Sequence, residues 1–129
     1  MERRAINPWI WQDQFGFSQA VEVSGAQKIL FCAGQTSVDK NGNVLHEGDI
    51  AGQANLALDN LEEVLKGAGM ELGNVVNLRI YTTDVDGLIA GLGAVAPRIF
   101  PIKASQTLIG VARLAFPTLL VELEATAVA

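Results

Sequence analysis

The hydrophobic period of the chain changes at Asp49, from the two-residue repeat of strands to the three- and four-residue spacing of an amphipathic helix. Asp49 suits the N-cap of this helix, and Gly67 and Gly69 suit its end. The sequence therefore predicts a helix of about five turns, long enough to cover one face of a sheet. The apolar residues that carry the spacing are Ile50, Ala54, Ala57, Leu58, Leu61, Val64, Leu65 and Ala68.

Strand-like segments lie on both sides of this helix. Residues 28–33 (KILFCA) form a continuously apolar run, which is typical of a strand buried on both faces, and residues 75–83 (VVNLRIYTT) alternate. Because a short loop joins the helix to the second segment, we expect a βαβ crossover whose strands are parallel or near neighbours. Residues 17–23 (FSQAVEV) also alternate and predict a half-buried strand.

The end of the chain holds two more apolar runs, 107–111 and 119–125, separated by a connection that contains Pro117. Both runs have the length and composition of strands, so we expect a terminal β-hairpin. Alternation along the second run places Glu122 and Glu124 on the same face. Two carboxylates in a segment this apolar indicate a functional surface.

A second helix is predicted over residues 88–99. Its apolar residues keep helical spacing, but its glycines and Pro97 oppose a helix, so we expect it to be kinked or frayed near Pro97. The predicted order is β-β-α-β-α-β-β, with a small type I′ hairpin added at Asn41-Gly42. This order defines the α+β class, with two helices on one face of a mixed sheet. The other face also carries apolar residues, so we expect a homo-oligomer with pockets where subunits meet.

The length of 129 residues fits a single domain, 1–129. Residues 1–16 are expected to form an N-terminal extended segment that packs on the core. Trp9 and Trp11 in this segment either cover the edge of the core or place one indole in a ligand cleft.

Composition narrows the possible functions. A net charge of −5 and a pI of about 4.7 argue against nucleic-acid binding, which needs clustered Lys and Arg. No apolar run approaches the ~20 residues of a membrane span, and the segment after Arg3-Arg4 lacks the apolar core of an export signal. A single Cys32 and a single His46 leave no internal disulfide and no histidine-rich metal site. We therefore expect a cytoplasmic protein that needs no metal and no cofactor.

Four segments of the chain carry a family pattern in their order and spacing: LFCAGQTSVDKNGNV, GQANLALDNLEEVLKGAG, VVNLRIYTTDVDG and GVARLAFPTLLVELEATAV. Together they resemble the Rid family, also called the YjgF-like or reactive intermediate deaminase family. The most telling pieces are the AGQ after the second strand, the QA…LDNL…AG helix and the VARL…VELEA end. The resemblance runs from about Gly16 to the C-terminus.

The resemblance implies a chorismate-mutase-like α+β fold, assembled as a homotrimer whose sheets form a central barrel with three clefts between subunits. Members with established activity hydrolyse reactive enamines and imines to ketones and ammonia. They use an arginine to hold the substrate carboxylate, an acidic residue of the last strand to position or activate water, and a tyrosine of the first strand.

Carried over by position, the family residues are partly kept and partly replaced. Glu122 matches the acidic residue, and Gly34 matches the glycine whose backbone lines the cleft. Gln106 falls at the arginine position, where it cannot form a charged bidentate grip on a carboxylate. Phe17 falls at the tyrosine position and lacks the hydroxyl.

Three further positions also depart from the family. Ala33 stands beside the cleft glycine where many members have Ser or Thr, Gly93 replaces an asparagine, and Leu108 replaces a cysteine. We expect a cleft that is wider, drier and less suited to anions. The resemblance implies Glu122 and Gln106 as the catalytic residues. The substrate-binding residues that it implies are Phe17, Ala33, Gly34, Gly93 and Leu108.

The leading hypothesis is a Rid-like hydrolase or deaminase that acts on a larger or less acidic enamine, imine or related carbonyl metabolite in the clefts between subunits. Glu122 would handle the water, and Gln106 would orient the substrate. A neutral hydrogen bond in place of a charged one should weaken recognition of a carboxylate ~10- to 100-fold, which disfavours small 2-imino acids. The alternative is a non-catalytic trimeric small-molecule binding protein that uses the same cleft, with Glu122 a solvated surface residue. RNA cleavage is disfavoured by the acidic charge.

Overall fold

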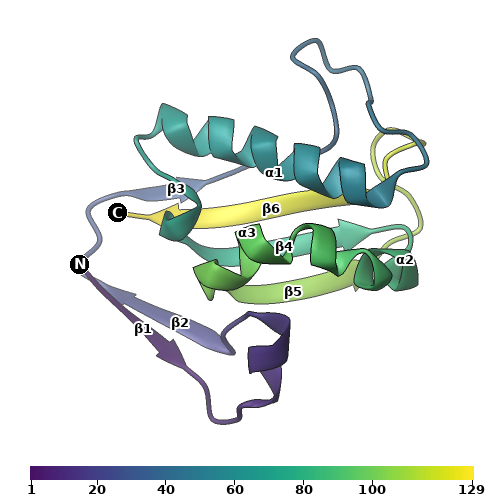
Figure 1. Cartoon of the computed structure of the whole chain (residues 1–129). Helices are drawn as coiled ribbons and strands as arrows, with labels where there is room; N and C mark the ends of the chain where they lie inside the picture. Colours follow the sequence, from purple (N-terminus) through teal and green to yellow (C-terminus); the bar gives the residue numbers. More distant parts are fainter.

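A four-stranded mixed sheet with helices on one face forms the body of the protein (Figure 1). The computed structural model describes residues 1–129. The strands are β3 (Ile29–Phe31), β4 (Val75–Thr82), β5 (Ser105–Gly110) and β6 (Val121–Val128). They lie in the order β3-β6-β4-β5, with β6 antiparallel to β3 and β4, and β4 parallel to β5. The predicted α+β class with a mixed sheet is confirmed.

Helix α1 (Ile50–Gly67) packs on β6 and is the helix that the change of period predicts. The Asp49 carboxylate caps it by accepting a hydrogen bond from the Gly52 N–H at 3.0 Å. The helix ends at Gly67, and the chain turns at Gly69, whose φ is +71°. Because β3 and β4 are both antiparallel to β6, they are parallel to each other, which confirms the expected direction of the crossover.

The small hairpin expected at Asn41-Gly42 lies between β3 and α1. Val38 forms an antiparallel bridge with Val44, and Gly42 has a φ of +82°. Asn41 keeps a negative φ, so the loop is not the type I′ turn expected for this dipeptide, which requires positive φ at both central residues.

The predicted terminal hairpin is wrong, because β4 lies between β5 and β6. Leu78 of β4 pairs with Gln106 on one side and with Ala125 on the other. The connection between β5 and β6 crosses the end of β4, where Val111 donates its N–H to the Thr82 carbonyl at 2.8 Å. A connection of this length can span an intervening strand, since neighbouring strands lie only about 4.8 Å apart.

The second helical region consists of short pieces. Its segments are α2 (Val85–Ala90), the 3₁₀ turn η3 (Leu92–Ala94), α3 (Ala96–Ile99) and the 3₁₀ turn η4 (Phe100–Ile102). The first break falls at Gly91, the residue that ends α2. Pro97 lies in the first turn of α3, where its missing N–H leaves no hydrogen bond unmade. The expectation of one helix kinked near Pro97 therefore places the break too late.

The N-terminal segment forms a two-stranded antiparallel ribbon, β1 (Glu2–Ile6) with β2 (Ala20–Ser24), and a 3₁₀ helix, η1 (Trp11–Phe15), between the two strands. Arg3 anchors this ribbon to the body. Its guanidinium donates to the backbone carbonyls of Gly73, Val75 and Ile102 at 2.7, 3.0 and 2.8 Å.

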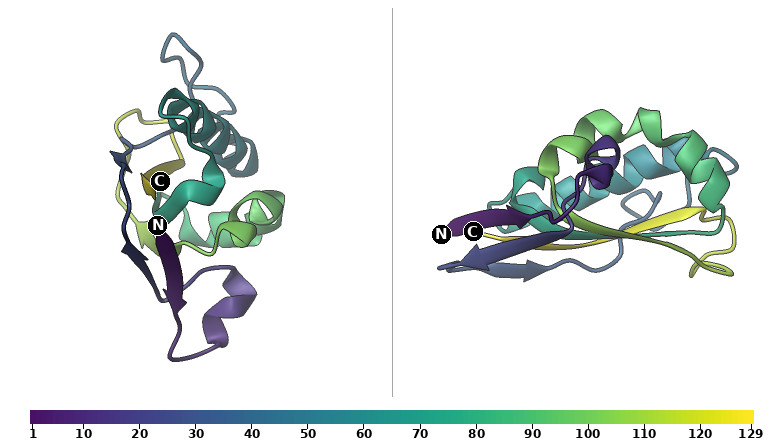
Figure 2. Two further views of the ribbon diagram at one scale, coloured as in Figure 1. Left: turned by 90° about the vertical axis from the view of Figure 1, so that its left-hand side faces the viewer. Right: turned by 90° about the horizontal axis from the view of Figure 1, so that it is seen from below.

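The core lies between the helices and one face of the sheet, and the helices leave the opposite face uncovered (Figure 2). On β3 of this open face, Ile29 is 61% exposed and Phe31 is 79% exposed. Large apolar side chains at this exposure favour a partner surface. None of the helices combines the length and apolarity needed to cross a membrane.

Candidate functional site

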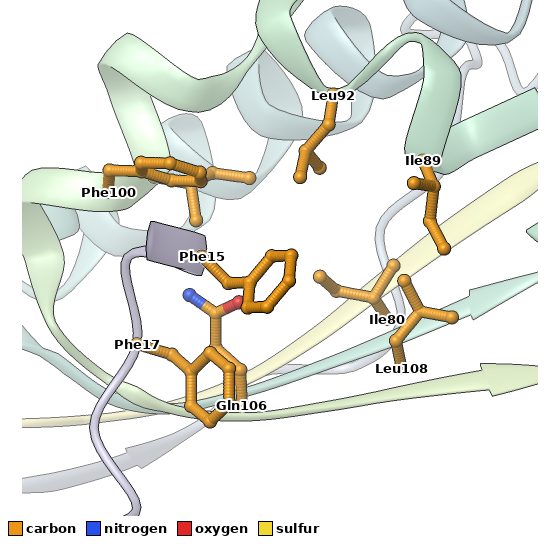
Figure 3. Close-up of a pocket in the computed structure, with 9 residues that line it drawn as sticks. Phe15, Phe17, Ile80, Ile89, Leu92, Phe100, Gln106 and Leu108 are labelled. Atoms are coloured by element: carbon orange, nitrogen blue, oxygen red, sulfur yellow. The ribbon is translucent and has the colours of Figure 1, made fainter. Parts of the chain in front are cut away.

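A pocket of about 250 Å³ opens between β4, β5 and the broken helical region (Figure 3). Of the side chains around it, only Gln106 is polar. The pocket is lined by Phe15, Phe17, Ile80, Ile89, Leu92, Ile99, Phe100, Gln106 and Leu108. This lining offers few hydrogen-bonding groups and suits an apolar ligand group.

The floor of the pocket comes from the sheet. The parallel register of β4 and β5 pairs Ile80 with Leu108, two residues along from the pair formed by Leu78 and Gln106. Side chains of paired residues point to the same face, so Ile80, Gln106 and Leu108 all face the helices. The broken helical region supplies the opposite wall.

The N-terminal segment supplies a third wall through Phe15 and Phe17. Gly16 between them has a φ of +72° and packs against Phe100 so closely that an added Cβ would lie 2.6 Å from the Phe100 Cβ. The ring of Trp11 contacts both phenylalanines edge-on, with its centroid 6.5 Å from that of Phe15 and 5.8 Å from that of Phe17. Trp9 and Trp11 are both absent from the lining itself.

The Gln106 side chain points into the pocket between Phe17 and Phe15 (Figure 3). Its Nε2 is buried and has no hydrogen-bond partner in the chain. A buried amide donor left without a partner costs about 1–3 kcal/mol, so such groups are normally satisfied by a ligand, water or another chain. Gln106 therefore brings an unpaired donor to the wall of the pocket, and a rotation of the side chain that uncovers Nε2 would present this donor to an oxygen in the pocket.

Glu122 lies on the open face of the sheet, against Gly34. A Cβ added at Gly34 would lie 2.6 Å from the Glu122 Cδ, so only glycine leaves room for this carboxyl group. The neighbouring Glu124 forms an ion pair with Arg79 at 3.0 Å and accepts from the Tyr81 hydroxyl at 3.4 Å. Glu124 is therefore committed to Arg79, whereas Glu122 remains free of an ion pair.

The sheet separates Gln106 from Glu122. Gln106 pairs with Leu78 of β4, whereas Glu122 pairs with Tyr81. Leu78 and Tyr81 are an odd number of residues apart in one strand, so they point to opposite faces. Within one chain the two implied catalytic residues therefore cannot reach the same small molecule.

The implied substrate-binding residues divide in the same way. Phe17 and Leu108 line the pocket with Gln106, whereas Gly34 contacts Glu122 on the open face. Ala33 is exposed next to Gly34. Gly93 is exposed beside Leu92 and lies outside the lining.

Sequence reasoning missed much of the pocket wall, above all Phe15 and Phe100. The available signal was the Phe15-Gly16-Phe17 pattern, in which a glycine with positive φ lets two aromatic side chains turn toward the same space. Phe100 carried no such signal, because it directly follows the predicted helix 88–99 and the sequence does not show which way its ring points.

The other reactive side chains lie outside the pocket. Cys32 is buried, and burial raises the pKa of its thiol, which keeps it protonated and poorly nucleophilic. His46 is exposed in the loop before α1. No group of three or more His, Cys, Asp or Glu side chains is arranged to hold a metal ion.

The fold and the pocket define a class of small α+β domains in which a mixed sheet and a broken helical layer enclose an apolar pocket, while the opposite sheet face stays open. Residues 12–129 match the protein family described as Endoribonuclease L-PSP, and the chain belongs to this family. Its Rid resemblance is confirmed by a solved structure, the Rid-family protein YyfB of unknown function from Yersinia pestis. The two chains are 38% identical, cover 100% of each other and superpose with a TM-score of 0.87.

Two curated relatives match over about half of this chain. The mitochondrial protein mmf2 of Schizosaccharomyces pombe is 40% identical over 74 residues, which is 57% of this chain and 55% of the relative. The 2-iminobutanoate/2-iminopropanoate deaminase of Mus musculus is 34% identical over 70 residues, which is 54% of this chain and 50% of the relative. The matches thus span about half the length of these two relatives.

Proposed function

We propose that this chain forms a homotrimer that hydrolyses an enamine, imine or related carbonyl metabolite in clefts between its subunits. The observation that carries the proposal is the placement of Gln106 and Glu122 on opposite faces of one sheet. A cleft between two copies can combine the pocket of one subunit with Glu122 of the next. The exposed Ile29 and Phe31 support such an assembly, because they leave apolar surface on the open face.

The chemistry needs one carboxylate and one orienting donor. Glu122 takes a proton from water as the water oxygen attacks the carbon of the C=N bond. The nitrogen is protonated and leaves as ammonia, so that imine and water give a carbonyl compound and ammonia. Gln106 holds the substrate by donating its amide N–H to a substrate oxygen. The deaminase name of the mouse relative supports this reaction class.

The substrate should differ from the small 2-imino acids that give the mouse relative its name. Those compounds carry a carboxylate, and no Lys or Arg lines the pocket. A neutral amide in place of an arginine lowers affinity for a carboxylate by about 10- to 100-fold. We therefore propose a larger or less acidic substrate.

A non-catalytic trimeric binding protein is the second candidate. The apolar lining favours it, because such a pocket binds molecules without any need for Glu122. RNA cleavage is not proposed, despite the description of the family, because a net charge of −5 opposes binding to a polyanion.

The substitution Glu122→Gln separates the two candidates. We expect ammonia release from an imine panel to fall at least about 100-fold, the scale of a lost general base, while the trimer and the melting temperature persist. Glu22→Gln is the matched control, because Glu22 lies on the N-terminal ribbon in an exposed ion pair with Arg4. Equal turnover by the Glu122→Gln and wild-type proteins would remove Glu122 from the mechanism. Ligand binding without any turnover would favour the binding protein.

A further inference from the structure

The pocket itself limits the kind of molecule that it accepts. The positively charged side chains nearest in sequence to the lining residues form ion pairs outside the pocket. Arg79 pairs with Glu124 on the opposite face of the sheet, and Arg98 pairs with Asp59 at 2.9 Å and Glu62 at 3.0 Å. A carboxylate placed among these apolar walls would lose its hydration without gaining a cation. The ligand group inside the pocket is therefore neutral.

The volume of the pocket sets the size of this group. A cavity of about 150 Å³ lined by aliphatic and aromatic side chains holds a benzene molecule. The cavity here measures about 250 Å³, so it has room for a phenyl-sized ring and a short chain. A two- or three-carbon substrate would leave most of the apolar wall without contacts, and van der Waals attraction falls steeply across such gaps.

Gln106 sets the polar requirement. Its side chain points into the cavity and its Nε2 has no partner, so a rotation that uncovers this buried atom would let the ligand satisfy it with a hydrogen-bond acceptor. A carbonyl oxygen meets this need without adding charge.

We propose that the pocket selects a neutral carbonyl compound, or the imine or enamine derived from it, that carries a phenyl-sized apolar group. The ring lies among Phe15, Phe17, Phe100 and Leu92, and the oxygen accepts a hydrogen bond from Gln106 Nε2. Phe15 determines specificity, because it brings the N-terminal segment onto the ring. This inference rests on the proposed function for the role of the pocket as the substrate site.

Binding of stable ketones tests the inference without any turnover. Three probes isolate the features: 4-phenylbutan-2-one has the ring and a neutral carbonyl, butan-2-one lacks the ring, and 2-oxo-4-phenylbutanoate adds a carboxylate. By calorimetric titration, we expect 4-phenylbutan-2-one to bind at least about 10-fold more tightly than either of the others, because a buried ring adds apolar contact and a buried carboxylate lacks a partner. Equal affinities for 4-phenylbutan-2-one and butan-2-one would overturn the inference.

Single substitutions test which side chains contact the bound ketone. Gln106→Leu should weaken binding of 4-phenylbutan-2-one by about 2- to 12-fold, the range of one hydrogen bond. Gln106→Arg should reverse the preference toward 2-oxo-4-phenylbutanoate. Phe15→Ala should weaken binding by about 10-fold or more. Phe116→Ala should leave it unchanged, because Phe116 is similarly exposed, at 47% against 44%, and lies outside the pocket.

The outcomes keep this inference separate from the proposed function. Unchanged binding in both Gln106→Leu and Phe15→Ala would overturn the inference, whatever the turnover. Selective binding of 4-phenylbutan-2-one without hydrolysis of its imine would support the inference and contradict the proposed hydrolase. Turnover of small 2-imino acids with no binding of the phenyl ketone would overturn the inference and support a hydrolase, and it would contradict the proposed larger or less acidic substrate.

Discussion

Two residues are central to the proposed chemistry, and each has a distinctive environment. Gln106 is a buried donor without a partner in an apolar pocket, and Glu122 is a carboxylate free of an ion pair that fills the space left by a glycine. The family resemblance selects both residues as candidates from the sequence alone. Their separation by the sheet could not, because it depends on the register of β4 with both of its neighbours.

Gly34→Ala tests the contact with Glu122. The new Cβ would meet the end of a flexible side chain, so the fold should lose less than about 1 kcal/mol while the carboxyl group moves and turnover falls at least about 10-fold. Ammonia release and urea denaturation measure the two effects. Gly67→Ala is the control: its Cβ meets nothing within 4 Å, so it should preserve turnover and stabilise α1. Full activity in Gly34→Ala would show that the position of the carboxyl group is not critical.

Among the helices and strands, the sequence predicts those features that depend on a local hydrophobic pattern. The helix that follows Asp49 matches α1 closely, because a hydrophobic stripe, a cap and a glycine stop all agree. The pairing of β5 and β6 was not predictable in this way, since adjacency in sequence does not tell which strand lies between two others. The pocket wall formed by η1 depends on a contact between Gly16 and Phe100, which are distant in sequence.

Gly16→Ala tests how that wall is held. Alanine would face both a positive φ and a clash with Phe100, so we expect a loss of about 2 kcal/mol or more and weaker binding of 4-phenylbutan-2-one. Gly42→Ala is the matched control, because its φ of +82° is similar and nothing lies within 4 Å of its Cβ. It should lose only about 1 kcal/mol and bind normally. Equal losses of stability in the two variants, measured by urea denaturation at one protein concentration, would argue against the packing role of Gly16.

In the molecule as a whole, the open face of the sheet exposes large apolar side chains that nothing within a single chain covers. Ile29 and Phe31 are exposed on an edge strand, where apolar surface invites association. We expect sedimentation to give a trimer and Phe31→Glu to shift it toward monomer with loss of turnover, because a buried charge would lack a partner. Glu2→Gln, an exposed position on β1 outside the four-stranded sheet, should remain trimeric. A wild-type monomer at micromolar concentration would contradict the interface site.

Complementation tests the shared site most directly. Glu122→Gln removes the carboxylate, and Leu108→Trp fills the pocket, so each variant alone should be inactive. If each site takes Glu122 from one subunit and the pocket from the next, a trimer assembled at random from equal amounts of both variants restores about one quarter of the sites by symmetry. Co-expression of the two variants should therefore recover about a quarter of wild-type ammonia release. Recovery no greater than the sum of the two variants alone would contradict a site built between subunits.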